Sequence, residues 1–256
     1  MKRAREYHPD MQDSVNEQFS LEQVLQWGSL PLLYHTADAP DKIRYLRTYT
    51  QTYLKEEIVA EQIIRKLNPF RLFLEIAAQH NGEIANYSNI ARDVGVDTVT
   101  IQSYFQILED TLVGFSKFYY FDLGIKRSLD GTVVQPLVPN TYGYGKAFEH
   151  FVILEAVRLN AYLERDFRFS YLLTKDGAEI DLIIERPGMP VVLVEIKSSG
   201  NVDERDTRTV ERFLKDFKKG EGYCWSLDPI AKKIGSVRAL HWREGLKEVG
   251  LAPLSP

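Results

Sequence analysis

Apolar residues recur at helical spacing near the start of the chain. The stripe runs from residue 21 to residue 27, and Ser20 with Gln23 forms a capping box in front of it. Residues 1–19 are polar and mixed in charge, and we expect them to be loosely ordered. The first helix is therefore predicted to begin directly after Ser20.

A second apolar stripe predicts a long helix from about Asp41 to Leu67. We expect Pro69 to end this helix, because a proline inside a helix removes a hydrogen bond and its ring clashes with the preceding turn. Residues 1–69 are thus predicted to form an N-terminal helical segment.

Residues 70–130 are predicted to form a helix-turn-helix followed by two short strands that supply a wing. The turn contains Gly95, and Asp97 is a suitable N-cap for the helix after it. The residues expected to face inward in the first helix are Leu72, Phe73, Ile76 and Ala77. The predicted helices span residues 70–80, 88–94 and 97–110, and the predicted strands span residues 112–115 and 118–121.

The pattern changes after a linker over residues 130–145, which is rich in proline and glycine. Strand-like and helix-like runs then follow one another, which is typical of α/β and α+β proteins with a mixed sheet. Residues 131–256 are therefore predicted to form one mixed-sheet domain. Its helices are expected over residues 148–162 and 206–218, and its strands over residues 168–173, 178–185, 191–197, 222–227 and 236–241.

Two neighbouring predicted strands carry charged residues inside apolar runs. The first contains Asp181, and the second contains Glu195 and Lys197. Burying such groups is costly unless they are paired or bind a metal ion. Glu195 and Lys197 are two residues apart and so share one face of the sheet. Asp181 joins them if the hairpin register places it opposite Glu195, which requires an odd number of loop residues.

Two carboxylates and one ammonium group at one point predict a site for Mg²⁺ or Mn²⁺. Asp181 and Glu195 would hold the ion, because Mg²⁺ prefers a few carboxylate oxygens and waters. The ion would activate a bound water, and Lys197 would position that water or stabilise charge on a phosphate.

These residues resemble the PD-(D/E)xK nuclease superfamily. The similar motifs are Gly177-x-Glu179-x-Asp181, then Glu195-x-Lys197-Ser198-Ser199, preceded by the helix that starts Gly145-Lys146-Ala147-Phe148-Glu149. The resemblance implies a nuclease-like fold with catalytic residues Glu149, Asp181, Glu195 and Lys197, of which the three carboxylates are the metal ligands. Glu155 is a rival to Glu149 on the same helix, and Ile180 stands where the superfamily has proline.

The chain over residues 20–245 also resembles the C-terminal portion of prokaryotic AAA-type ATPases that end in a conserved domain of unknown function. The similar stretches include Gly28-Ser29-Leu30-Pro31 and Phe118-Tyr119-Tyr120-Phe121-Asp122. In those proteins a P-loop ATPase precedes a winged helix and a nuclease-like domain. The resemblance implies that residues 1–69 are a remnant of the ATPase lid and that the ATPase domain, the expected partner, is missing from this chain.

The sequence departs from these families in two places. No G-x-x-x-x-G-K-[ST] motif occurs, and Tyr142-Gly143-Tyr144-Gly145-Lys146 is not one, because Ala147 follows the lysine. We therefore expect no ATP site in this chain. The passage from Phe115 to Phe118 is also shorter than the basic hairpin of the relatives.

Composition narrows the classes of protein that fit. Among the 256 residues 44% are apolar and 27% are charged, and Cys224 is the single cysteine, so we expect a cytoplasmic globular protein without disulfides. No apolar run is long enough to span a membrane, and we expect no membrane partner. A net charge of −4 argues against non-specific coating of nucleic acid.

Two functions stay open at this stage. The first is a Mg²⁺-dependent nuclease that hydrolyses DNA or RNA, and the second is a non-catalytic module that binds nucleic acid or protein on a nuclease-like fold. The predicted helix over residues 97–110 has no lysine or arginine, which favours a structural or protein-contact role over DNA reading. Residues 205–219 carry six basic side chains, which form either a solvated face or a phosphate-tracking one. Oligomer formation stays open as well.

Overall fold

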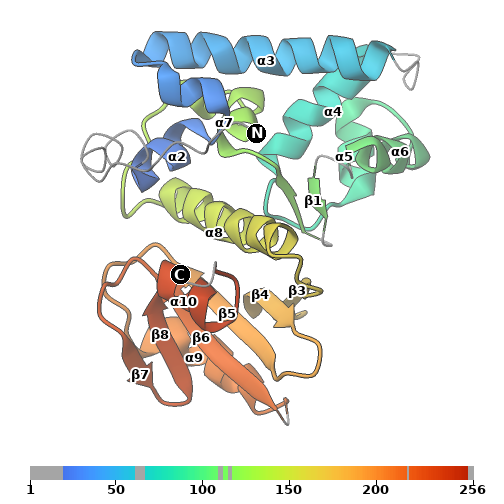
Figure 1. Cartoon of the computed structure of the whole chain (residues 1–256). Helices are drawn as coiled ribbons and strands as arrows, with labels where there is room; N and C mark the ends of the chain where they lie inside the picture. Colours follow the sequence, from blue (N-terminus) through green and yellow to red (C-terminus); the bar gives the residue numbers. More distant parts are fainter. Residues whose placement is uncertain (1–19, 61–66, 109–111, 115–116, 218, 253–256) are drawn as a thin grey trace, which may run out of the picture.

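A computed structural model describes residues 20–60, 67–108, 112–114, 117–217 and 219–252. A helical unit lies on one side and a sheet unit on the other, and helix α8 (Tyr142–Tyr162) runs between them (Figure 1). The protein therefore has mixed α+β architecture. The expectation for residues 1–19 lies outside the described residues.

Two helices form where the apolar pattern predicts them, although the second begins at Ala39 rather than at Asp41. Its expected stretch over residues 61–66 lies outside the described residues. Helix α2 (Leu21–Trp27) is capped by Ser20, whose side chain accepts a hydrogen bond from the Gln23 backbone N–H at 3.3 Å. The 3₁₀ helix η2 (Pro31–His35) follows, and then helix α3 (Ala39–Ala60) crosses the far side of the helical unit (Figure 1). Leu25 and Leu46, which have no exposed area, anchor α2 and α3 in the core.

The prediction that Pro69 ends a helix is wrong. Helix α4 (Leu67–Gln79) contains Pro69 in its first turn, where its missing N–H would have had no partner within the helix. The inward set also needs a correction, because Leu72 is 40% exposed whereas Phe73 and Ala77 are fully buried. The phase of the helix is set by Phe70, Phe73 and Leu74, which all lie in the core.

Two short helices and a strand pair complete the first core. Helix α5 (Tyr87–Val94) ends at Gly95 with a left-handed φ of 77°, and Asp97 caps helix α6 (Thr98–Leu108) through Thr100 N–H at 2.7 Å. Strand β1 (Leu112–Gly114) pairs antiparallel with β2 (Phe118–Tyr120). Tightly packed rings fill this core, namely Phe70, Phe73, Tyr104, Phe105 and Phe118.

The segment between the two units holds more regular structure than its turn-rich composition predicts. Helix α7 (Leu123–Leu129), which the apolar pattern did not reveal, is capped by Asp122, and a 3₁₀ helix, η3 (Thr132–Val134), follows it. Helix α8 begins at Tyr142 rather than at residue 148, because the Thr141 side chain accepts from Tyr144 N–H at 3.3 Å. The predicted linker therefore ends before its last glycines.

The sheet unit contains six strands in the order β3-β4-β5-β6-β8-β7. The β3, β4 and β5 strands are antiparallel neighbours, β5, β6 and β8 run parallel, and β7 returns antiparallel to β8. The sequence pattern did not reveal β7 or helix α10. The bounds are β3 (Arg168–Leu173), β4 (Glu179–Glu185), β5 (Val191–Lys197), α9 (Glu204–Leu214), β6 (Gly220–Ser226), β7 (Lys232–Ile234), β8 (Val237–His241) and α10 (Trp242–Glu248).

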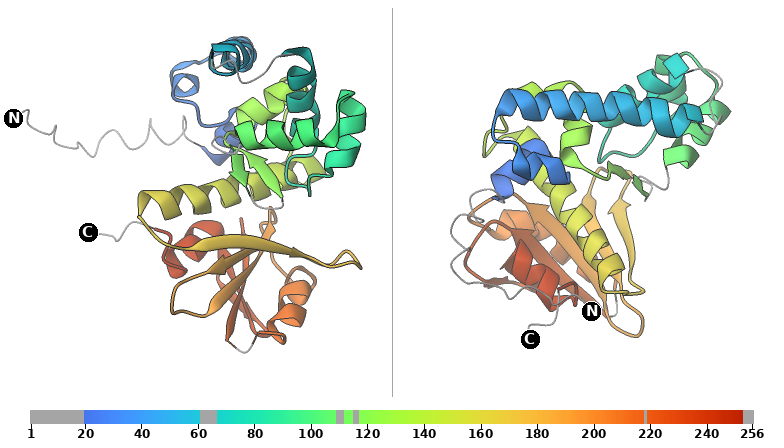
Figure 2. Two further views of the ribbon diagram at one scale, coloured as in Figure 1. Left: turned by 90° about the vertical axis from the view of Figure 1, so that its right-hand side faces the viewer. Right: turned by 45° about the horizontal axis from the view of Figure 1, so that its top comes forward.

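Helices cover both faces of the sheet (Figure 2). On one face, Val192, Val194 and Ile196 of β5 join a core cluster with buried residues of α8 and α10. On the other face, Leu193 joins a cluster with Val210 and other residues of α9. Since β5 alternates between two covered faces, both sets of its side chains are apolar except near its end, where Glu195 and Lys197 stand.

Candidate functional site: a carboxylate cluster where two strands separate

Strands β4 and β5 separate at Asp181. Their cross-strand pairs run from Ile184 opposite Val192 to Leu182 opposite Val194, so the next position would bring Asp181 opposite Glu195. The pairing stops there, and the Asp181 carboxylate accepts the Ile196 backbone N–H at 2.7 Å instead. Asp181 thus fills the seam between the strands, and the register has the parity that the sequence argument required.

Three carboxylates meet at this seam. Oxygens of Glu149, Glu179 and Asp181 all lie within 4.8 Å of one another. Glu149 comes from α8 and is 7% exposed, while Glu179 stands two residues before Asp181. Like charges so close together need cations between them.

Two lysines supply positive charge to this cluster, one from α8 and one from the helical unit. Lys146 lies one turn before Glu149 on α8 and donates to its Oε2 at 2.8 Å. Lys117 comes from the helical unit, is 3% exposed, and pairs with Glu179 while its Nζ lies 3.6 Å from Glu149 Oε1. Tyr119 also donates to Glu149 Oε1, at 2.9 Å.

Glu195 and Lys197 lie on the other side of the seam. They alternate with Val194 and Ile196, which face α8, so they project toward the face that α9 covers. Lys197 Nζ donates to Glu195 Oε1 at 2.5 Å, and among the described residues Glu195 Oε2 is buried without a hydrogen-bond partner. Glu195 is therefore near the cluster without sharing its 4.8 Å oxygen set.

The surroundings of the cluster shift the pKa values of Asp181 and Glu149 in opposite directions. Burial, followed by repulsion from Glu149 and Glu195, raises the pKa of Asp181 to about 8. Burial also acts to raise the pKa of Glu149, but the ammonium groups of Lys117 and Lys146 outweigh it and leave that pKa lowered. One proton is thus held at Asp181 near neutral pH while Glu149 is ionised.

Neighbours of Glu149 on α8 have structural roles. Glu155, its rival, is paired with Arg158 at 3.3 Å, away from the carboxylate cluster. His150 is buried, and its ring donates from Nε2 to the Tyr120 carbonyl at 2.6 Å and accepts from the Asn81 amide through Nδ1 at 3.3 Å. Burial lowers the pKa of His150 to about 3, so this ring stays neutral and joins α8 to β2.

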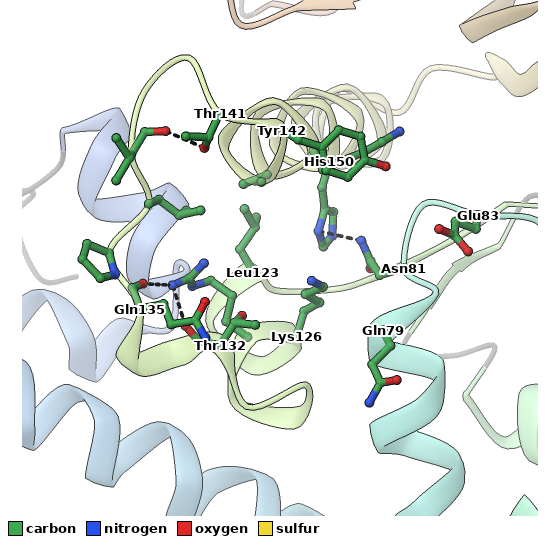
Figure 3. A pocket seen from close by; sticks show the side chains of 17 residues that line it. Gln79, Asn81, Glu83, Leu123, Lys126, Thr132, Gln135, Thr141, Tyr142 and His150 are labelled. Carbon is green, nitrogen blue, oxygen red and sulfur yellow. Dashed lines mark hydrogen bonds between the residues drawn. The ribbon is translucent and has the colours of Figure 1, made fainter. Parts of the chain in front are cut away.

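A cavity of about 350 Å³ opens on the other side of α8 from the sheet, between α8, α7 and the end of α4 (Figure 3). Its wall includes His150 and Asn81, whose hydrogen bond is drawn in Figure 3, together with Lys126 and Tyr142. Lys146 lines the same cavity and also holds Glu149, so a single side chain connects this space to the carboxylate cluster.

Three residues that form or contact the cluster were not predicted as site residues, although two of them stand inside the motifs quoted above. Glu179 has the period-two spacing from Asp181 that marks a shared strand face, and Lys146 has the i,i+3 spacing from Glu149, so both signals were present in the sequence. Lys117 is 62 residues from Glu179 in the chain, and no local pattern announces their contact.

The two elements weighed as nucleic-acid interfaces are both exposed on one side. In α9, Arg205 is paired with Asp203 at 2.6 Å and Arg212 with Asp176 at 3.5 Å, so part of its positive charge is compensated; Lys218 lies outside the described residues. In α6, Val99 is 69% exposed, and the helix has no basic side chain.

The donor set fits a hard divalent cation. Three carboxylates offer converging oxygens, and the buried Glu195 Oε2 has no protein partner among the described residues. Within the described part of the chain, no helix combines the length and apolar character needed to cross a bilayer.

Comparison with known families matches two successive parts of the chain. Residues 18–130 match a domain of unknown function (DUF8612), and residues 144–243 match a second domain of unknown function (DUF4143). No curated protein and no solved structure matches the chain. The carboxylate cluster takes Glu149, Glu179 and Asp181 from the second region and the compensating Lys117 from the first, and that second domain is commonly found in proteins associated with AAA-type ATPases.

Proposed function

We propose that the protein is a metal-dependent nuclease that hydrolyses phosphodiester bonds of DNA or RNA. The observation that carries the proposal is the convergence of Glu149, Glu179 and Asp181 at the point where β4 and β5 separate. A buried acidic cluster of this kind destabilises a fold, because carboxylates repel one another and lose hydration. A function that depends on the cluster explains why the fold contains it. Recognition of a phosphate through a bound cation is such a function.

The residues divide into two roles under this proposal. Glu149, Asp181 and Glu179 would hold Mg²⁺ or Mn²⁺, and Glu195, whose charge acts on Asp181, would bind the ion through a water. The bound ion lowers the pKa of a coordinated water and offsets negative charge on the phosphate. Lys197, paired with Glu195 and 37% exposed, would hold the scissile phosphate or the attacking water.

The proposed setting is a larger assembly. Because the second matching domain is commonly found in AAA-associated proteins, we propose that an ATPase domain acts with this chain. The winged-helix identity of residues 70–130 belongs to the same proposal, and it rests on the arrangement of α4, α5, α6 and the β1–β2 strand pair. The lack of basic residues on α6 argues that this part contacts protein rather than reads DNA.

Cleavage of defined substrates tests the enzymatic proposal. Plasmid DNA, single-stranded DNA and RNA would be incubated with the protein and Mg²⁺ or Mn²⁺, with Asp181→Ala run in parallel. Asp176→Asn is a matched control, because it removes a carboxylate that is exposed and paired with Arg212 outside the cluster. Cleavage by wild type and control but not by Asp181→Ala supports the proposal. Cleavage that survives Asp181→Ala points to a contaminant, and no cleavage of any substrate removes the enzyme claim.

A second candidate is a non-catalytic binding module. It is favoured by the ion pairs already present at the site, since Lys117 and Lys146 pair with carboxylates of the cluster and Lys197 pairs with the neighbouring Glu195. Calorimetry with Mg²⁺ separates the two functions. A nuclease must take up the ion at a site that Asp181→Ala abolishes, whereas a binding module needs no uptake.

A further inference from the structure

Lys117 contacts two of the three carboxylates that would hold the proposed metal ion. Its side chain is only 4% exposed, it pairs with Glu179, and its Nζ lies 3.6 Å from Glu149 Oε1. The ring of Tyr171 on β3 lies 5.4 Å from the same ammonium group and closes the site from the side. The ammonium group therefore competes for oxygens of Glu149 and Glu179, two members of the converging set.

A buried ammonium group and a divalent cation cannot share these oxygens. Mg²⁺ requires oxygens at about 2.1 Å and would repel a positive charge held a few Å away. The carboxylates in turn cannot remain together without a cation, because their mutual repulsion is strong in a buried site. Lys146 and the proton at Asp181 relieve part of this repulsion, and we expect the remaining positive charge to come from either Lys117 or the metal ion.

Lys117 is supplied by the helical unit rather than by the sheet unit. It directly precedes β2, and its backbone forms an isolated bridge to Ile84. The strand pair reaches down beside α8 toward the sheet (Figure 1), which brings this side chain to β4. Withdrawal of Lys117 would thus require movement of its side chain or of the strand pair.

From this geometry we propose that Lys117 is an internal substitute for the metal ion and that it regulates the site. The ammonium group keeps the carboxylate cluster together in the metal-free protein, and divalent cation and Lys117 bind in competition. Loading the metal expels Lys117 and loosens the contact between β2 and the sheet unit. Conversely, any partner that pulls the strand pair away opens the site to metal. This inference rests on the proposed metal site and adds a regulator to it.

Calorimetric titration of the whole chain with Mn²⁺ tests the competition. Lys117→Met removes the ammonium group and is expected to increase Mn²⁺ affinity about 10-fold or more relative to wild type. Lys126→Met is the matched control, because it removes the same charge from a partly buried pair with Asp130 and should leave the affinity within about 2-fold. Equal Mn²⁺ affinity in wild type and Lys117→Met overturns the competition and leaves the metal site standing. Absence of uptake in both overturns both proposals.

Chemical labelling of the wild-type protein gives a second readout that needs no variant. Acetylation of lysines, followed by mass spectrometry, is expected to leave Lys117 protected without metal, since its side chain is 4% exposed. Saturating Mn²⁺ should raise the labelling rate of Lys117 at least about 5-fold while Lys126 and Lys232 stay unchanged. Continued protection of Lys117 in protein that calorimetry shows to be loaded overturns the proposal.

Discussion

Two aspartates of the sheet unit lie in opposite electrostatic environments. Asp228, just beyond β6, is 2% exposed and accepts hydrogen bonds from Val202 N–H at 3.0 Å, Ile230 N–H at 2.9 Å and Lys232 at 2.6 Å. Asp181 accepts one backbone hydrogen bond and faces two further carboxylates. The bond from Lys232 and those from the two backbone groups hold the pKa of Asp228 at about 2, whereas that of Asp181 is raised to about 8.

The difference in pKa separates a structural aspartate, Asp228, from a candidate ligand-binding aspartate, Asp181. Asp228 has a donor for each of its oxygens, so the fold itself stabilises its charge. Asp181 is placed where folding alone disfavours its charge. A binding partner that carries positive charge would remove this conflict, which is why Asp181 belongs to the candidate site.

The largest expected effect is on metal binding and catalysis at Asp181. Asp181→Asn should lower Mn²⁺ affinity and the cleavage rate by about 100-fold or more, because it removes a charged oxygen ligand from a three-carboxylate set. Asp228→Asn should leave both unchanged per folded molecule. Calorimetry measures the Mn²⁺ affinity of both variants, and a cleavage assay measures their rates. Equal losses in the two variants would show that Asp181 has no special role in metal binding.

The next effect is on stability, where we expect the substitution of Asp228 to be more harmful than that of Asp181. Asp228→Asn should lower the free energy of unfolding by about 2 to 3 kcal/mol at pH 7, since it removes a buried charge that Lys232 and two backbone donors stabilise. Because the folded-state pKa of Asp228 lies below the ordinary value, this contribution is present above pH 4 and fades as the pH falls toward 2. Urea unfolding at several pH values checks it.

A smaller effect is expected from pH on Asp181 in metal-free protein. A folded-state pKa of about 8 means that the folded protein binds more protons than the unfolded one between pH 4 and 8, so stability falls as the pH rises through this window. Asp181→Asn cannot ionise, and relative to wild type it should gain about 1 to 3 kcal/mol between pH 5 and pH 8 in the presence of a chelator. A constant difference between the two proteins at all pH values would contradict the assigned pKa.

The smallest expected effect concerns Glu179, the partly exposed member of the carboxylate cluster. Glu179→Gln should weaken Mn²⁺ binding about 10-fold, less than Asp181→Asn, because Glu179 is 31% exposed and water can replace its oxygen. Glu221→Gln, on β6 and paired with Arg186, is the control and should not alter Mn²⁺ affinity. An effect of Glu179→Gln as large as that of Asp181→Asn would make the two acids equivalent ligands.

Much of the sheet unit follows from strand periodicity. The bounds of β3 and β5 agree with the sequence expectation residue for residue, and the parity that relates Asp181 to Glu195 follows from the hairpin length. These features depend on local alternation, which a single sequence displays. Helix α7 and strand β7 are short and depend on contacts such as the Asp122 cap and pairing with β8, so their local patterns were too weak.

The site was predictable only in part. Glu149 and Asp181 were expected to meet, and the structure brings them together with Glu179, while it keeps Glu195 across the seam with Lys197. The separation arises because the pairing of β4 with β5 stops at Asp181, a backbone detail that periodicity does not encode. Lys117 enters from another unit, and a long-range contact of this kind has no signature in the chain.

The adjacency of Glu149 and His150 on α8 has a mechanical consequence. Consecutive residues of a helix point about 100° apart, so one peptide directs a carboxylate into the acidic seam and an imidazole toward Tyr120 and Asn81. Because the imidazole is neutral and tightly hydrogen-bonded, it acts as a fixed pivot rather than as a proton carrier. A displacement of β2 would therefore move His150 and, through the adjacent peptide, the Glu149 carboxylate in the acidic seam. The other strands of the sheet need not move.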